Sequence, residues 1–412
     1  MLERRLEADR SLLGELMTAA QQAATVPGLP AATKQAIEAL EHDGLALVKQ
    51  GREGDATRAF YHAIALGLGR PWKARDEYAR SLVLRTRASV SDPDVPVLLE
   101  LGQSFTSTHP SDTLLSARAT LQSRGGAPRE LGSFEGIPPD LIHRSWAFSI
   151  AAREIPEGNH AIEVEVRDDA GLLRRVSTPL RLVRGLEHAR TDVERRLSVL
   201  GAQGDTVASI RYPFDFALQV NLGRVDPRDF DFRRAIEEST ALLARLEAGK
   251  DPLRGAAGDL NRHYWFAQAG EIMPYRLIVP ESYDGSRAFP LIVALHGRGG
   301  NQDTMAMRPS GLMQRLAREH GYIVASPMGY RPDGGYGGIT PAAPLTNASR
   351  IRASQLSELD VMNVLERVVA EYRIDPDRIY LAGHSGGGGG AWRLGAKYPE
   401  RCRLLVMMPE TL

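Results

Sequence analysis

The sequence predicts an α/β protein whose C-terminal part is a mostly parallel sheet, preceded by a helical region and a small β-sandwich. After residue 261, short apolar runs such as PLIVALHG, YIVASPMG and RIYLAGHS alternate with helical patterns. Strands this apolar are buried on both faces, which is typical of a parallel sheet covered by helices. Upstream, the period of the apolar residues changes from three or four to two near residue 93, which separates helices from strands.

The first two predicted regions differ in this period. Residues 1–92 are expected to be helical, because apolar residues in AIEALEHDGLALVKQ and ATRAFYHAIALGLG recur at three- and four-residue steps. Residues 93–187 are expected to form an accessory β-sandwich of the Ig-like kind. In HAIEVEVRD, for example, Ile162, Val164 and Val166 fall on one face of a strand and charged residues on the other.

Two further regions complete the predicted order. Residues 188–260 are expected to be a helical connector, in which FDFRRAIEESTALLARLEAG predicts a helix that stops at Gly249. Residues 261–412 are expected to form the α/β domain. Within it, SELDVMNVLERVVAEY predicts an amphipathic helix with Ser357 as its N-cap and Asp360 three residues on.

Composition excludes several classes of protein. The 51 basic and 51 acidic residues balance without a block of one sign, which argues against nucleic acid as a partner. The single cysteine, Cys402, excludes an intramolecular disulfide framework. No apolar run approaches the roughly 18 residues of a membrane span. The start lacks the layout of a signal peptide, so the chain as written is expected to be cytoplasmic, or secreted or periplasmic if its true start lies upstream.

The stretch YLAGHSGGGGGAW contains five consecutive glycines after a serine, which is compatible with a linker or with a tight catalytic turn. A buried strand, RIYLA, precedes Ser385 and a helical pattern follows it, which is the context of a nucleophile elbow. Side chains two positions before and after the serine would collide in such a turn, so Gly383 and Gly387 are expected there, with His384 between Gly383 and Ser385. The elbow is favoured over the linker.

A second glycine-rich turn supports acyl-transfer chemistry. LIVALHGRGG is an apolar strand that leads into a loop, and acyl transfer requires N–H donors aimed at the developing oxyanion. We expect these donors to be the main-chain N–H groups of Arg298 and Gly386. His296 and Gly297 are expected to support this loop, although a plain strand-ending turn is the simpler alternative.

PYRLIVPESYDG, PLIVALHGRGG and RIDPDRIYLAGHSGGGGGAWRLGAKYPER resemble the α/β-hydrolase serine esterases of the polyhydroxybutyrate-depolymerase and feruloyl-esterase type. The resemblance covers about residues 261–412. It implies hydrolysis of small-molecule or polymeric carboxylic esters, of feruloyl, acetyl-xylan or polyester type, through an acyl-enzyme on Ser385, without a cofactor or metal. Many relatives have methionine where this chain has Gly386. GHSGGG is also similar to prolyl-oligopeptidase relatives.

The catalytic triad that the resemblance implies is incomplete in this chain. In α/β-hydrolases an acid and then a histidine follow the serine. None of the 27 residues after Ser385 is a histidine or an aspartate, and the remaining acids there are Glu400 and Glu410. The upstream histidines weighed as substitutes, and not favoured, are His263, His296, His320 and His384. We therefore expect a truncated, nearly inactive esterase.

Other functions remain open from the sequence. One is a serine peptidase of the prolyl-oligopeptidase type, and another is a non-catalytic protein that binds carbohydrate or a partner and retains a vestigial hydrolase half. The segment DGGYGG, residues 333–338, is expected at the sheet edge where ligands bind, either as a floppy surface loop or as a substrate contact. Protein partners and the oligomeric state are not indicated.

Overall fold

The computed structural model describes residues 2–123, 125–227, 230–307, 311–338, 348–402 and 404–408. It divides into two compact units that differ from the four predicted regions. The first unit comprises Met1–Ala189 and Phe216–Arg233, and the second comprises Arg190–Asp215 and Arg234–Leu412. The helical connector expected over residues 188–260 is therefore shared between two units rather than forming a region of its own.

Four helices begin the first unit: α1 (Leu2–Ala23), α2 (Ala31–Lys49), α3 (Glu53–Gly67) and α4 (Ala74–Ser81). The core of α1, α2 and α3 is built around Phe60, which is fully buried on α3, whereas Tyr78 of α4 packs in the sandwich core. A Cβ placed on Gly44 of α2 would lie 2.5 Å from the Phe60 ring, so the absence of a side chain there permits close packing of α2 on α3.

Two sheets in the first unit enclose a common core, which gives a sandwich. One sheet has the order β1-β3-β6 and the other β2-β8-β7-β4-β5. The strands are β1 (Leu82–Thr86), β2 (Val90–Ser91), β3 (Val97–Gln103), β4 (Leu115–Ser123), β5 (Arg129–Ile137), β6 (Trp146–Ile150), β7 (Gly158–Asp168) and β8 (Gly171–Leu182). The predicted faces of Ile162, Val164 and Val166 are buried in this core.

The boundary predicted at residue 92 is wrong. The sandwich begins with β1 at Leu82, inside the region expected to be helical, and Leu82 and Leu84 are buried in its core. The reason is local: burial alternates along LVLRT, but its sequence is three apolar residues followed by two polar ones, which does not separate a strand from the helix that precedes it.

Three helices follow the sandwich: α5 (Leu186–Leu200), α6 (Asp205–Asn221) and α7 (Phe232–Glu247). The helix predicted to stop at Gly249 ends two residues earlier, at Glu247, and Gly249 adopts a φ of 77° in the turn that follows. In the second unit, the Ser239 hydroxyl of α7 donates to the Ile210 carbonyl of α6 over 2.5 Å. In the first unit, the amide of Asn221, at the end of α6, pairs with the backbone of Val90.

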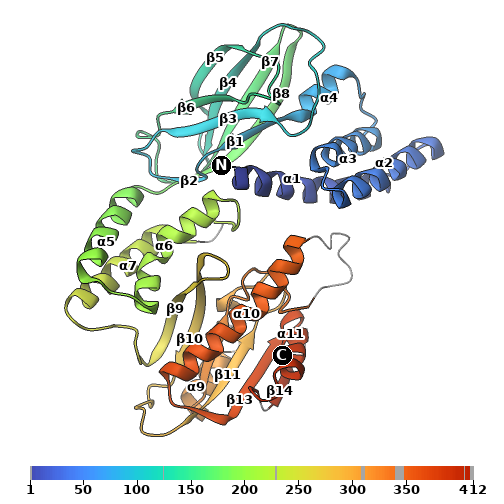
Figure 1. Ribbon diagram of the computed structural model, residues 1–412. Coiled ribbons are helices and arrows are strands. Elements are labelled where there is room, and N and C mark those ends of the chain that lie inside the picture. Colours follow the sequence, from blue (N-terminus) through green and yellow to red (C-terminus); the bar gives the residue numbers. More distant parts are fainter. Residues whose placement is uncertain are drawn as a thin grey trace. The chain divides into compact units, whose positions relative to one another are not determined.

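The second unit contains a six-stranded sheet with the order β14-β13-β11-β12-β10-β9 (Figure 1). Its strands are β9 (Gly258–Phe266), β10 (Glu271–Val279), β11 (Phe289–Leu295), β12 (Ile323–Pro327), β13 (Ile374–His384) and β14 (Leu404–Met408). The pairs β11–β12, β11–β13 and β13–β14 are parallel. β10 contains the run PYRLIV, which was expected in a parallel sheet. It instead runs antiparallel to both β9 and β12.

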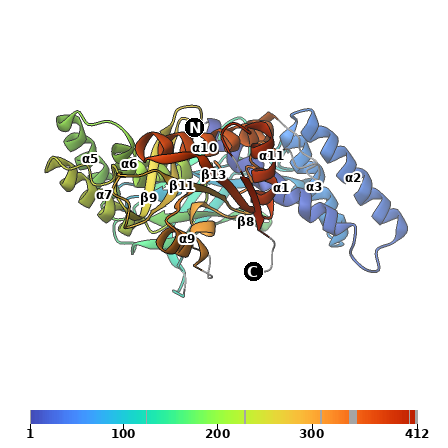
Figure 2. The same cartoon turned by 90° about the horizontal axis from the view of Figure 1, so that it is seen from below.

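Helices cover both faces of this sheet: α8 (Gln302–Ala306), α9 (Leu312–His320), α10 (Ala348–Glu371) and α11 (Gly386–Lys397). Along β11, Leu291, Val293 and Leu295 pack in one core with α10 and α11, whereas Ile292 and Ala294 pack in a second core with α8 and α9. Figure 2 shows α10 and α9 on opposite sides of the strands. Both faces of β11 are therefore buried, as its continuous apolar sequence predicts.

α10 is longer at its start than the sequence predicts. It begins at Ala348, so Ser357 lies inside the helix rather than at its N-cap, and both Ser357 and Asp360 are fully buried. A buried ion pair also ties α10 to β9: Arg262, whose side chain is 2% exposed, makes two hydrogen bonds with Glu371 over 2.8 and 3.0 Å. Among the described residues, no helix is long and apolar enough to cross a membrane.

Candidate active site

Ser385 lies in a sharp turn between β13, which ends at His384, and α11, which begins at Gly386. Its backbone has a φ of 50° and a ψ of −118°, a conformation that is strained for a residue with a side chain. A Cβ on Gly383 would lie 2.1 Å from the Gly387 carbonyl oxygen. Ser385 itself is exposed, so the turn presents its hydroxyl to solvent. The structure thus places a strained, accessible serine between a strand and a helix.

Two glycines of the five-residue run allow close packing. A Cβ on Gly387 would lie 2.2 Å from the Leu295 carbonyl oxygen, and one on Gly390 would lie 2.5 Å from the ring of Tyr336. A Cβ on Gly389, by contrast, would meet no atom within 4 Å. The run is therefore a helix start that is packed on one side and open on the other.

The backbone nitrogen of Arg298 lies beside Gly386. A Cβ on Gly386 would be 3.5 Å from that nitrogen, so the two residues expected to provide oxyanion donors are brought together. Arg298 is in the loop after β11, where the Gly300 N–H donates to the Gly297 carbonyl and closes a turn. The role of these N–H groups as donors stays a prediction.

The side chain of His296 contacts the backbone of this loop. Its ring is buried, and its Nδ1 and Nε2 lie 2.7 Å from the carbonyl oxygens of Gly297 and Met328. His296 therefore connects the loop after β11 to the loop after β12. Both ring nitrogens are hydrogen-bonded to carbonyl oxygens, and neither is bonded to the Ser385 hydroxyl.

The DGGYGG segment is held in place and lines the site, in contrast to a floppy surface loop. Tyr336 adopts a φ of 51° and is 3% exposed. Its hydroxyl donates to the His296 carbonyl over 3.0 Å, and its N–H donates to the Ser357 hydroxyl over 3.0 Å. The Gly337 N–H donates to the Ser354 carbonyl. Tyr336 therefore joins α10, α11 and the loop after β11.

Asp360 anchors the start of the loop after β12. Its carboxylate accepts hydrogen bonds from the Tyr264 hydroxyl over 2.7 Å and from the Tyr330 N–H over 2.9 Å. Tyr330 has a φ of 64°, and the carboxylate holds it in that conformation. Burial raises the pKa of Asp360 to about 6. The sequence offered one signal for this role, an acidic residue on the apolar face of α10.

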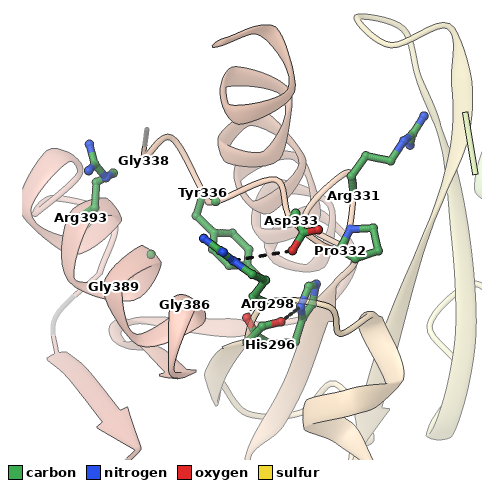
Figure 3. A pocket seen from close by; sticks show the side chains of 13 residues that line it. His296, Arg298, Arg331, Pro332, Asp333, Tyr336, Gly338, Gly386, Gly389 and Arg393 are labelled. Carbon is green, nitrogen blue, oxygen red and sulfur yellow. Dashed lines mark hydrogen bonds and ion pairs between the residues drawn. The ribbon is translucent and has the colours of Figure 1, made fainter. Parts of the chain in front are cut away.

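A pocket of about 240 Å³ opens beside Gly386 (Figure 3). Its polar lining includes three arginines that come from different elements: Arg298 after β11, Arg331 after β12 and Arg393 on α11. The Nη2 of Arg331 donates to both carboxylate oxygens of Glu271, over 2.9 and 3.0 Å. Sequence reasoning missed Arg331 and Arg393, since no local motif marks residues that only the fold brings to one pocket.

No imidazole of the second unit hydrogen-bonds to the Ser385 hydroxyl in the part of the chain that the structure describes. His384 packs against Gly297 near Ser385, since a Cβ on Gly297 would lie 3.2 Å from the His384 Nδ1 and 3.4 Å from the Ser385 Cβ. His263 packs on Tyr212 with ring centres 3.9 Å apart, and burial lowers its pKa to about 3. His320 is exposed just before β12, and so lies at the opposite end of the parallel strands from Ser385.

The two acidic candidates do not complete a triad either. Glu400 is exposed in the turn after α11, at the end of that helix away from Ser385. Glu410 lies outside the described residues. Within the described ranges, the structure therefore assembles the serine, its turn and the adjacent N–H groups without a hydrogen-bonded base.

Comparison with known proteins gives one family match, in the C-terminal part of the chain. The family model described as Esterase matches residues 267–409, which include Ser385 and every residue of the pocket. No curated protein sequence matches the chain.

Several solved structures are similar to part or most of the chain. They include an S-formylglutathione hydrolase from Staphylococcus aureus (18% identity, 37% of this chain and 59% of that one, TM-score 0.29). A ferulic acid esterase from Anaeromyces mucronatus has 18% identity over 35% of this chain and 54% of that one, with a TM-score of 0.29. A thermostable esterase has 14% identity over 79% of this chain and 76% of that one, with a TM-score of 0.28.

The chain spans 59% of the length of the first of these structures, and the TM-scores are too low to define the fold of the whole chain. Residues 267–409 match the esterase family model, and the turn at Ser385 lies within this range.

Proposed function

We propose that the protein hydrolyses carboxylic esters through an acyl-enzyme on Ser385. The observation that carries this proposal is the geometry of Ser385, an exposed serine with a φ of 50° between β13 and α11. The esterase family match over residues 267–409 supports it and gives no support to the peptidase or non-catalytic alternatives. Feruloyl, acetyl-xylan and polyester substrates are those that the sequence resemblance implies.

In the proposed reaction the Ser385 hydroxyl oxygen attacks the ester carbonyl carbon, and the carbonyl oxygen takes the negative charge. We propose that the N–H groups of Gly386 and Arg298 donate to that oxygen, and the proximity of the Arg298 backbone nitrogen to Gly386 supports this. The proton of Ser385 passes through solvent to the leaving alcohol. Water then attacks the acyl carbon, which breaks its bond to the serine oxygen, releases the acid and returns a proton to the serine. The adjacent loop, fixed by His296 and Tyr336, keeps the donors in place.

The proton of Ser385 has no acceptor among the histidines of the second unit that the structure describes. We therefore propose that this chain is a slow enzyme. Triad knockouts retain about 10³–10⁴ over the reaction in water, from the oxyanion hole and substrate binding, and we expect a rate in this range.

A fluorophosphonate probe tests the proposal, because it reacts with nucleophilic serines. We expect slow labelling that maps to Ser385 and is lost in Ser385→Ala. The exposed Ser286 provides a matched control, since Ser286→Ala removes a hydroxyl outside the pocket. If neither the probe nor an activated aryl ester modifies Ser385, the proposed function is wrong. Fast labelling would support the proposed esterase and contradict the proposal that Ser385 lacks a catalytic base.

A further inference from the structure

The pocket beside Ser385 carries more positive than negative charge. Its lining contains three arginines and one carboxylate, that of Asp333. The side chains of Arg298 and Asp333 face each other over 3.8 Å, and Arg331 is paired with the buried Glu271. These two pairs balance the charges of Arg298 and Arg331, and they leave the charge of Arg393 to be accounted for.

Arg393 makes no ion pair or hydrogen bond with any residue in the described ranges. Its guanidinium packs beside Gly338, where a Cβ would lie 3.2 Å from the Arg393 Nε and Nη2. Glu358 of α10 is bound through its Oε1 by the Lys397 ammonium and the Tyr398 hydroxyl, and its Oε2 lies beside Gly337. Arg393 is exposed, so its donors open onto the pocket.

Arg393 and Gly386 share one face of α11. They are seven residues apart, which is within about 20° of two full turns and about 10 Å along the axis. Gly389 lies between them, and the position of its missing Cβ has no atom within 4 Å. Figure 3 shows Gly386, Gly389 and Arg393 in succession along this helix. An open path therefore runs from the serine turn to the guanidinium.

We propose that Arg393 binds a carboxylate carried by the substrate, so that the preferred esters have a negative group a few bonds from the reacting carbonyl. A guanidinium presents paired N–H donors that match a carboxylate, which makes arginine suited to this role. This inference rests on the proposed function and adds a substrate class to it. Arg393 acts here as a specificity-determining residue.

The test compares two aryl esters of the same chain length. One is the mono-4-nitrophenyl ester of adipic acid, and the other is 4-nitrophenyl hexanoate, which has a methyl group in place of the carboxylate. The measurement is the rate of acylation of Ser385, followed by the mass of the intact protein and corrected with Ser385→Ala. We expect the adipate ester to react about three- to fivefold faster, as for a partly exposed ion pair, and this preference to shrink at high salt.

Variants separate Arg393 from general charge effects. In Arg393→Gln the ratio of the two rates should fall to about one, and in Arg393→Lys it should be intermediate, since lysine keeps the charge without the paired donors. The matched control is Arg318→Gln, which removes an exposed arginine of α9 on the other side of the sheet.

Each outcome has a distinct meaning. Acylation of Ser385 by both esters at equal rates, or a preference that survives Arg393→Gln, overturns the carboxylate proposal and leaves the esterase intact. A preference that Arg318→Gln removes as well would attribute the effect to the overall field and also overturn the proposal. Acylation by neither ester overturns the proposed function and, with it, this inference.

Discussion

Gly387 and Gly389 belong to the same run of glycines, and the structure predicts opposite effects when each is changed to alanine. A Cβ on Gly387 would lie 2.2 Å from the Leu295 carbonyl oxygen and 2.5 Å from that of His296. Both oxygens belong to the backbone at the end of a central strand, so neither can move as a flexible side chain would. At Gly389 the added methyl group would meet no atom within 4 Å.

The magnitudes follow from these distances. The contact at Gly387 is more than 1 Å shorter than ordinary van der Waals contact, which begins near 3.4 Å. Overpacking of this kind costs about 3 kcal/mol or more, because α11 must move away from β11. Alanine at Gly389 should instead stabilise the protein by about 0.5–1 kcal/mol, since glycine is a poor helix former.

Thermal unfolding followed by calorimetry measures both changes. We expect Gly387→Ala to lower the melting temperature of the second unit by roughly 6–12 °C, and Gly389→Ala to raise it by about 2 °C. Acylation of Ser385 should also fall in Gly387→Ala, because the helix start that positions Gly386 is displaced. Equal stability of the two variants, or a destabilised Gly389→Ala, would refute the assignment of α11 against β11.

Three further predictions concern buried charges. Burial raises the pKa of Asp360 to about 6, above its value near 4 in an unfolded chain. The free energy of unfolding should therefore decrease as the pH rises from about 4 to 6. Urea unfolding measured across that range should show this decrease, and Asp360→Asn should remove it. Glu371→Gln should lower the free energy of urea unfolding by about 3–5 kcal/mol because it leaves the charge of Arg262 buried without a counterion, whereas a loss below 1 kcal/mol would contradict the observed pair. The Arg75 guanidinium lowers the pKa of Asp168 to about 2. The stability that this pair contributes above pH 4 should therefore be lost as the pH falls towards 2. In Asp168→Asn the free energy of urea unfolding should decrease less over that acidic range.

Much of the fold could be predicted because its signals are local. The strand before Ser385 follows from a short apolar run, and the sandwich follows from alternation in segments such as HAIEVEVRD. The errors also have local causes. β1 is five residues long and directly follows a helix, so its period could not be separated from the helical one. The start of α10 was misplaced because Ser357 and Asp360 look like a cap, whereas both are buried partners of a distant loop.

The candidate site was only partly accessible to sequence reasoning. The turn at Ser385 could be recognised because steric limits at Gly383 and Gly387 act between neighbours in the chain. The contributions of Tyr336 and Arg393 to the pocket could not be recognised from the sequence, since their positions depend on how α10 and α11 pack around the loops after β11 and β12.

The sequence alone determined that a serine is presented in a tight turn between a buried strand and a helix, because local steric and periodic signals suffice for that. The tertiary structure decided that β10 runs antiparallel to its neighbours, since strand direction depends on long-range pairing. It also decided which charges meet beside Gly386, where Arg298, Arg331 and Arg393 converge from three separate elements. Side chains far apart in the chain come together only when the sheet and its helices have packed, and it is this packing that selects the chemistry of the pocket.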